Sequence, residues 1–177
     1  LVLSGTHCIM SASMDGAIHV WGVNVSQGAS LPRYAKPYIS VRLTGPGDEG
    51  RCLAQWSGGT DTVVLLGTSR GRMVFWDVRH MREINTLSHP AAHGSIEALA
   101  LDPQRHWVCA GTSNGYVALW DTRFHVRLQT WRTSNRARIR ACALHPTRQH
   151  VLAVATSAVV SVDLSSGAVR EPFYSGA

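Results

Sequence analysis

The feature that most constrains the fold of this chain is a sequence motif that occurs more than once. The strings "SASMDGAIHVWGV", "GTSRGRMVFWDV" and "GTSNGYVALWDT" follow one another and align on their tryptophans. Trp21, Trp76 and Trp120 then fall into register at intervals of 55 and 44 residues. A fourth, eroded copy, "ATSAVVSVDL", has Val162 in the tryptophan position, 42 residues further on. Repeats of this length indicate a blade or solenoid architecture rather than an ordinary compact domain.

Each copy reads as a tight hairpin, because two apolar runs flank a two-residue turn. The turns are Asp15-Gly16, Arg70-Gly71 and Asn114-Gly115. Asp-Gly and Asn-Gly are typical of type I′ turns, in which both central residues have positive φ. Arg70 fits such a turn poorly, and the fourth copy has no such pair.

The apolar runs before the turns, such as "TVVLLG" and "WVCAG", are continuous rather than alternating. Antiparallel strands joined by tight turns usually have one solvent-exposed face, which gives alternating apolar and polar residues. A continuous apolar run therefore implies that both faces of the strand are buried. Further strand-like runs precede and follow each hairpin, for example "SIEALAL" and "REINTLS", which gives four strands per repeat. Four-stranded repeats of this kind are propeller blades. We therefore predict an all-β fold with almost no helix.

The repeats also predict how the chain is divided. We expect a single partial β-propeller over residues 1–177, with about four blades of four antiparallel strands at approximately 1–43, 50–88, 94–133 and 137–175. The first blade is truncated, and "LVLS" is the expected remnant of its missing strand. Propellers close with about four to eight blades, so the chain is expected to form part of a larger ring.

Composition and motifs exclude several functional classes. The formal net charge of +6 permits an acidic partner without demanding one. The four cysteines form no C-x-x-C pair, so we expect reduced, buried thiols and neither a zinc site nor a redox motif. None of the nine histidines has metal-binding spacing, and the chain contains no G-x-S-x-G elbow, paired-carboxylate site or cofactor fingerprint. We expect no catalytic residue, no metal and no cofactor.

The strings "GTSNGYVALWD" and "GTSRGRMVFWD" resemble the WD-repeat family, whose blades end a hairpin with Gly-x-[Ser/Thr]-x-Asp-Gly and a later Trp-Asp. The resemblance implies a buried tetrad of His, Ser or Thr, turn Asp and Trp within a blade. The candidates are His93, Thr112, Asn114 and Trp120 in the third copy, Ser13, Asp15 and Trp21 in the first, and Thr68 and Trp76 in the second. The first copy has no visible His, and Arg70 prevents the tetrad in the second. The remaining histidines are expected in exposed loops.

A longer stretch, "GSIEALALDPQRHWVCAGTSNGYVALWDTRF" followed by "ARIRACALHP", carries a more specific likeness. It resembles the C-terminal WD-repeat region of the regulatory, protein-kinase-like subunits of class III phosphatidylinositol 3-kinase complexes. The resemblance implies a non-catalytic protein-interaction scaffold that holds a lipid kinase subunit against coiled-coil subunits. It also implies a cytoplasmic location, peripheral on endosomal or autophagic membranes through the complex, with roles in protein sorting and autophagy.

Two other surface features suggest partner contacts. The strings "WDVR" and "WDTR" place Asp77, Arg79, Asp121 and Arg123 in equivalent positions, as in the WD-repeat substrate receptors of cullin-4 ubiquitin ligases. The alternative is that each arginine pairs locally. The segment from Trp131 to Arg148 contains no acid and includes Arg136, Arg138 and Arg140, which could present guanidinium groups to a carboxylate-rich protein. No nucleic-acid-binding module accompanies this segment, so we expect no nucleic acid partner.

Overall fold

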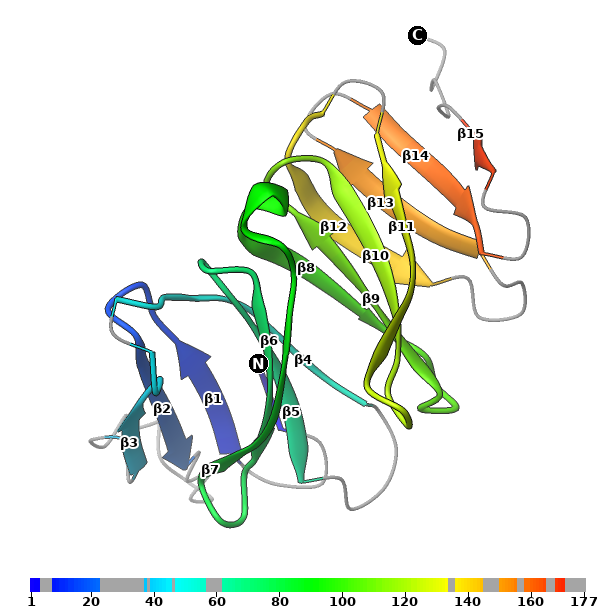
Figure 1. The fold of residues 1–177 in the computed structure, drawn as a ribbon. Coiled ribbons are helices and arrows are strands. Elements are labelled where there is room, and N and C mark those ends of the chain that lie inside the picture. The colour runs from blue at the N-terminus through cyan, green and yellow to red at the C-terminus, as the bar shows by residue number, and fades with distance from the viewer. Residues whose placement is uncertain are drawn as a thin grey trace, which may run out of the picture.

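The computed structural model describes residues 1–3, 8–22, 37, 39–45, 47–56, 62–133, 136–144, 150–155, 158–164 and 168–170. These residues form four antiparallel sheets (Figure 1). The first sheet contains β1 (Cys8–Ala12), β2 (Ala17–Gly22) and β3 (Ile39–Arg42). The second contains β4 (Gly50–Gln55), β5 (Val63–Thr68), β6 (Arg72–Asp77) and β7 (Arg82–Ser88). The third contains β8 (Ile96–Leu101), β9 (Trp107–Thr112), β10 (Tyr116–Asp121) and β11 (Val126–Arg132). The fourth contains β12 (Ile139–Leu144), β13 (His150–Ala155), β14 (Ala158–Asp163) and β15 (Val169–Arg170).

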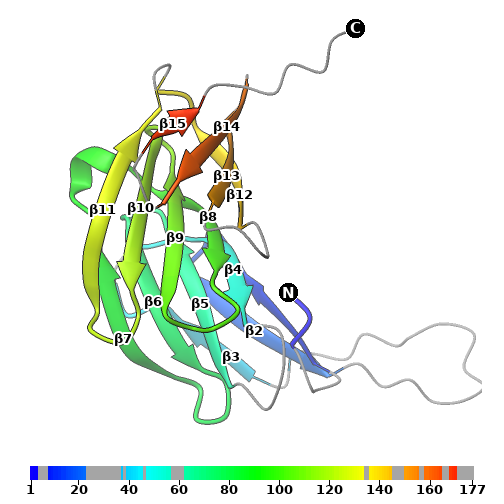
Figure 2. The same cartoon turned by 90° about the vertical axis from the view of Figure 1, so that its right-hand side faces the viewer.

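The sheets are arranged as blades of a propeller. The first strands of successive sheets, β4, β8 and β12, lie next to one another, and the later strands of each sheet spread outward (Figures 1 and 2). The sole helical turn in the described part of the chain is a 3-10 turn at Ala91–His93. The prediction of an all-β, partial propeller of antiparallel four-stranded blades is confirmed.

The first blade has three strands and a short segment in the fourth place. Val2 forms an antiparallel bridge with Ile9 of β1, and the backbones of Leu1 and Met10 exchange two hydrogen bonds of 3.0 and 2.8 Å. Residues 1–3 therefore lie on the edge of β1 opposite to β2. This is the position that β4 and β8 occupy beside β5 and β9 in the next two blades.

The hydrophobic core lies between blades rather than inside any one of them. In β5, Val64, Leu65 and Leu66 are all fully buried although their side chains alternate between the two faces. Val64 and Leu66 pack toward the first blade, and Leu65 packs toward the third. The inner strands of the described blades that lie between two neighbours are therefore covered on both faces, as the continuous apolar runs predicted.

The hairpin turns differ from the prediction. Positive φ occurs at the turn glycines, Gly16, Gly71 and Gly115, but not at the residue before each of them. Each glycine N–H instead donates to the carbonyl three residues earlier, as Gly71 does to Thr68 at 3.2 Å. This is a type I turn followed by a glycine in the left-handed region. Since the middle of a type I turn accepts most residues, Arg70 is accommodated without backbone strain.

Candidate interaction sites

The third blade is tied to the connection that precedes it by a tryptophan–histidine hydrogen bond. Trp120 Nε1 donates to His89 Nε2 at 3.3 Å, and both side chains are buried. The prediction that His93 supplies this histidine is therefore wrong, and so is the expectation that His89 lies in an exposed loop. His89 directly follows β7, where its N–H donates to Gly71 O at 2.8 Å. His93 lies at the end of the 3-10 turn and stacks on Tyr116 instead, with ring centroids 4.0 Å apart.

The bond from Trp120 also fixes the protonation of His89. An indole N–H can only donate, so His89 Nε2 carries no proton and the neutral ring carries it on Nδ1. Nδ1 lies 3.4 Å from His93 Nδ1, which is placed to accept it. Desolvation by burial, followed by the charges of His93 and Arg127, lowers the pKa of His89 from 6.5 to about 4. The histidine of the Trp120–His89 hydrogen bond is therefore neutral at ordinary pH.

The other residues predicted for the tetrads of the second and third blades have local roles. Thr112 Oγ1 accepts from the N–H of Tyr116 at 3.1 Å, and Thr68 Oγ1 accepts from the N–H of Arg72 at 3.2 Å. Both threonines are buried and close the hairpin that follows them. Asn114 Nδ2 donates to the Ala92 carbonyl at 3.0 Å. None of these bonds reaches the tryptophan, so the four-membered network is replaced by separate pairs.

In the first blade, Ser13 and Asp15 of the predicted set are joined by a side-chain hydrogen bond, but Trp21 bonds elsewhere. Trp21 Nε1 donates to Ser11 Oγ at 3.2 Å. Asp15 is exposed and accepts from the N–H of Ala17 at 2.9 Å, a bond that leads the causes lowering its pKa. Trp21 is half-buried because its face of the first blade meets no neighbouring sheet among the described residues, whereas Trp76 and Trp120 each lie between two blades.

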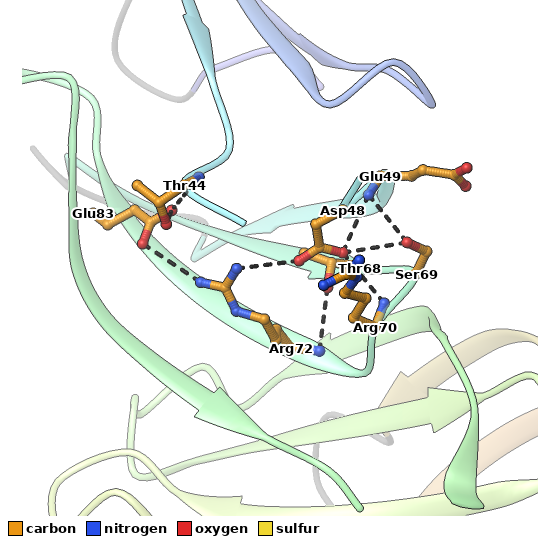
Figure 3. Close-up of polar contacts among 8 residues, drawn as sticks. All are labelled: Thr44, Asp48, Glu49, Thr68, Ser69, Arg70, Arg72 and Glu83. Atoms are coloured by element: carbon orange, nitrogen blue, oxygen red, sulfur yellow. Dashed lines mark hydrogen bonds and ion pairs between the residues drawn. The ribbon is translucent and has the colours of Figure 1, made fainter. Parts of the chain in front are cut away.

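The second blade contains a polar cluster that the sequence patterns did not indicate (Figure 3). Its centre is Asp48, which is 3% exposed and lies just before β4. Asp48 Oδ1 accepts from the N–H of Arg70 at 3.2 Å, from Ser69 Oγ at 3.2 Å and from the N–H of Glu49 at 3.1 Å. Asp48 Oδ2 accepts from Arg72 Nη1 at 3.2 Å.

Arg72 extends this cluster toward the outer strand of the blade. Its other terminal nitrogen, Nη2, lies 3.6 Å from Glu83 Oε2, and Glu83 Oε1 accepts from Thr44 Oγ1 at 2.8 Å. The cluster thus ties the connection between the first two blades to the β5–β6 turn and to β7 (Figure 3). Trp76 Nε1, by contrast, has no hydrogen-bond partner among the described residues. As expected, the second blade lacks the tetrad, and a reversed arrangement, with the acid in the connection, takes its place.

The two Trp-Asp-x-Arg turns have similar backbones and different side-chain pairs. Asp77 Oδ1 accepts from the N–H of Arg79 at 2.8 Å, while Asp77 Oδ2 pairs with His80 Nδ1 at 2.7 Å. Asp121 Oδ2 instead pairs with Arg123 Nη2 at 2.7 Å, and this guanidinium contributes most to lowering the pKa of Asp121 to about 2. Both carboxylates are used within their own turns.

The three arginines of the predicted patch are all exposed, and one of them has a partner in the neighbouring blade. Arg138 Nη2 pairs with Glu97 Oε1 of β8 at 2.8 Å, so this side chain bridges two neighbouring blades. Arg140 is exposed at an irregularity in the pairing of β12 with β13, and Arg136 is exposed with a φ of 50°. Because the pairing is irregular at Arg140, the regular two-residue alternation that would align it with Arg138 does not apply.

The cysteines are free, and burial raises the pKa of Cys52 and of Cys142 to about 12. Within the described ranges, no three His, Cys, Asp or Glu side chains gather in a way that could hold a metal ion. The same residues include no helix that is long and apolar enough to cross a bilayer.

Comparison with curated proteins gives relatives of two kinds. The probable serine/threonine-protein kinase vps15 of Dictyostelium discoideum is 34% identical over 134 residues, which are 73% of this chain and 7% of that protein. The serine/threonine-protein kinase VPS15 of Arabidopsis thaliana is 26% identical over 138 residues, 74% of this chain and 9% of that protein. The small ribosomal subunit protein RACK1z of Arabidopsis thaliana is 34% identical over 84 residues, 48% of this chain and 20% of that protein. The chain therefore spans less than a tenth of the two kinases.

Among solved structures, the β-propeller domain of Cps50 (Swd1) from Myceliophteria thermophila superposes with a TM-score of 0.59 at 18% identity, over 69% of this chain and 36% of that one. This likeness concerns the fold alone. Residues 7–174 match the family model described as "Nucleolar protein 10-like, N-terminal domain", a β-propeller family. The matched domain is of a non-catalytic kind, and the kinase region of the vps15 relatives lies outside the matched segment. The chain therefore belongs to the WD-repeat β-propeller family, in the group described as nucleolar protein 10-like N-terminal domains.

Proposed function

We propose that this propeller is the WD-repeat part of a regulatory subunit of a class III phosphatidylinositol 3-kinase complex, where it acts as a scaffold in endosomal sorting and autophagy. The observation that carries the proposal is the repeated match to vps15 kinases. The Dictyostelium, yeast, Arabidopsis and fission yeast proteins each align with 72–74% of this chain. WD-repeat propellers generally serve as protein-interaction scaffolds, and the fold supports this general role for the chain.

The partners proposed are a lipid kinase catalytic subunit and coiled-coil subunits, and membrane association is proposed to be peripheral, through the complex. The surface offers groups suited to protein contacts. Phe124 is 72% exposed and Leu128 is 54% exposed on the outer part of the third blade. Arg136 and Arg140 are exposed beside the paired Arg138. The proposed location is cytoplasmic, on endosomal or autophagic membranes.

Co-purification of the tagged full-length protein from cells tests this proposal. Recovery of the lipid kinase and the coiled-coil subunits in fixed proportion is expected. A double variant, Arg136→Glu with Arg140→Glu, is expected to reduce this recovery, whereas Arg42→Glu at the end of β3, the outer strand of the first blade, serves as the matched control. Absence of both partner types from the wild-type preparation would contradict the proposal.

A second candidate function is that of a substrate receptor of a cullin-4 ubiquitin ligase. The observation in its favour is the equivalent placement of Asp77–Arg79 and Asp121–Arg123 at the ends of β6 and β10. Against it, Asp121 is neutralised by Arg123 at 2.7 Å and Asp77 pairs with His80, so local turn closure accounts for both acids. Exposed ion pairs of this kind stabilise little. The variants Arg79→Glu and Arg123→Glu are expected to abolish recovery of the cullin adaptor only if this second function is correct.

A further inference from the structure

An apolar groove lies between the second and third blades, and none of the interactions described above involves it. It has a volume of about 460 Å³ and lies where β6 and β10 end. Its apolar lining includes Trp56, Val63, Phe75 and Ile84, and Arg105 and His125 lie on its polar side. This volume falls in the range of sites that bind small molecules or single large side chains.

The lining of the groove is held in place by contacts of its own. Trp56 Nε1 donates to the Asp102 carbonyl at 2.8 Å, which fixes the indole ring against the third blade. Phe75 meets His125 edge to face, with ring centroids 6.0 Å apart. Trp56 and Phe75 are each 7% exposed, so they are part of the core between the blades as well as of the groove. Such a preformed apolar surface requires little reorganisation when a ligand binds.

Ile84 brings an exposed apolar side chain to this groove because of a β-bulge. The pairing of β6 with β7 shifts between Phe75 and Trp76, and Ile84 is the extra residue. Ile84 is 55% exposed. The third blade has an equivalent β-bulge. The pairing of β10 with β11 shifts between Leu119 and Trp120, and Leu128 is the extra residue, 54% exposed. Leu128 does not line the groove, so the chain itself provides a matched control.

The charges at this end of the blades select the kind of ligand. Three acids lie here, and each accepts hydrogen bonds within its own turn: Asp77 from Arg79 N–H, Asp102 from Gln104 N–H at 3.1 Å and His106 N–H at 3.0 Å, and Asp121 from Arg123. Five arginines lie on the same turns or on the adjacent strand starts: Arg79, Arg82, Arg105, Arg123 and Arg127. All five are exposed. Glu83, at the start of β7, adds a fourth acid and pairs with Arg72. Among the described residues Arg105 is the one charged side chain that lines the groove itself, and the described charged groups around it, five arginines against four acids, leave a slight positive excess.

We propose that this groove binds a short acidic peptide segment of a partner protein, with one large apolar side chain seated against Ile84 and Phe75 and flanking carboxylates facing the arginine rim. Burying one such side chain is expected to raise the affinity at least tenfold, and carboxylates near a basic rim add affinity that salt weakens. The proposal is independent of the lipid kinase assembly, because a peptide site on one pair of blades does not require that complex.

Fluorescence anisotropy on the full-length protein tests it. The probe is a labelled synthetic peptide with a central leucine–phenylalanine pair and two glutamates on each side. Two matched peptides replace the glutamates by lysines or the apolar pair by alanines. Saturable binding in the micromolar range is expected for the first peptide, with at least tenfold weaker binding of the other two and a loss of affinity as salt is raised.

The variant Ile84→Asp is expected to lower the affinity at least tenfold, whereas Leu128→Asp leaves it unchanged. Both positions are exposed bulge residues, so both variants are expected to fold, and equal hydrogen-exchange protection of β6 and β10 checks this. The proposal is overturned by the absence of saturable binding, by equal effects of the two variants or by equal binding of the lysine peptide. A self-association that Ile84→Asp alone abolishes would overturn it as well, since the occupant would then be a second copy of the chain.

Discussion

Removing the carboxylate of Asp48 should loosen the β5–β6 turn of the second blade, although Asp48 lies outside the turn. In the variant Asp48→Ala, the N–H of Arg70 and the hydroxyl of Ser69 lose this acceptor, and Arg72 loses one partner. The N–H of Glu49 loses one of its two acceptors and keeps Ser69 Oγ. A hydrogen bond to a charged group contributes about 1.5–3 kcal/mol, but the half-exposed Arg72 and the hydroxyl can bond to water. We therefore expect a local cost of about 3 kcal/mol. Asp48→Asn keeps the Oδ1 acceptor without the charge and should cost roughly half as much.

Hydrogen exchange of the turn segment Thr68–Arg72 measures this directly. Because 1.4 kcal/mol corresponds to a factor of ten, Asp48→Ala should speed exchange there roughly 100-fold and Asp48→Asn roughly 10-fold. Asp15→Ala is the control, since Asp15 has the family's acid position but is exposed and bonds only within its own hairpin. An acceleration below threefold in Asp48→Ala, or an equal effect of Asp15→Ala on this segment, would refute the assignment of Asp48 as the acid of the second blade.

Three further outcomes are expected. The contribution of His89 to the free energy of unfolding should be present in full above pH 6.5. It should fall by about 3 kcal/mol as the pH drops from 6.5 to about 4, because the unfolded chain protonates His89 while burial keeps this ring neutral in the native state. Urea titrations at several pH values should show this slope for wild type, with most of it lost in His89→Gln. His93→Gln should keep most of it, since burial lowers the pKa of His93 too but this ring is less buried than that of His89. Gly67→Ala should destabilise by about 1–3 kcal/mol in the same assay, since its Cβ would lie 2.6 Å from Ile96 Cγ2 of the next blade. Cys142, whose pKa burial raises to about 12, should react with iodoacetamide at pH 8 orders of magnitude more slowly than after denaturation, as read by mass spectrometry.

The strands could be predicted closely because their burial is visible in the residue types. The run "REINTLS" coincides with β7, Arg82–Ser88, and "SIEALAL" differs from β8 by one residue. The two-sided burial of β5 and β9 requires apolar residues at consecutive positions, and this is a property of the sequence itself. The strand β7 was predicted although its composition is mixed, and it begins five residues after β6 ends, as β11 does after β10. The strand β3 begins 17 residues after β2 ends, so this spacing does not identify it.

The turn chemistry and the histidine were mispredicted for reasons that a dipeptide pattern does not contain. Asp-Gly and Asn-Gly suit a type I′ turn, but here the glycine alone has positive φ, so Arg70 is as acceptable as Asp15. His89 and His93 lie seven and three residues before β8, and residue type does not separate them. Only the hydrogen bond of His89 N–H to Gly71 O, which places it under the turn of its own blade, decides which one reaches Trp120.

Asp48 could not be found by pattern because it lies in a glycine-rich connection that reads as a loop, yet its place follows a rule common to the blades. In the third blade, His89 from the preceding connection binds Trp120, and Ala92 from the same connection accepts from Asn114. In the second blade, Asp48 from the preceding connection binds the turn at Arg70. What each of these blades requires is therefore a tie between its hairpin and the connection before it, and a neutral histidine or a buried carboxylate can meet that requirement. This explains how the family's tetrad residues can be lost from both blades while the blades keep their shape.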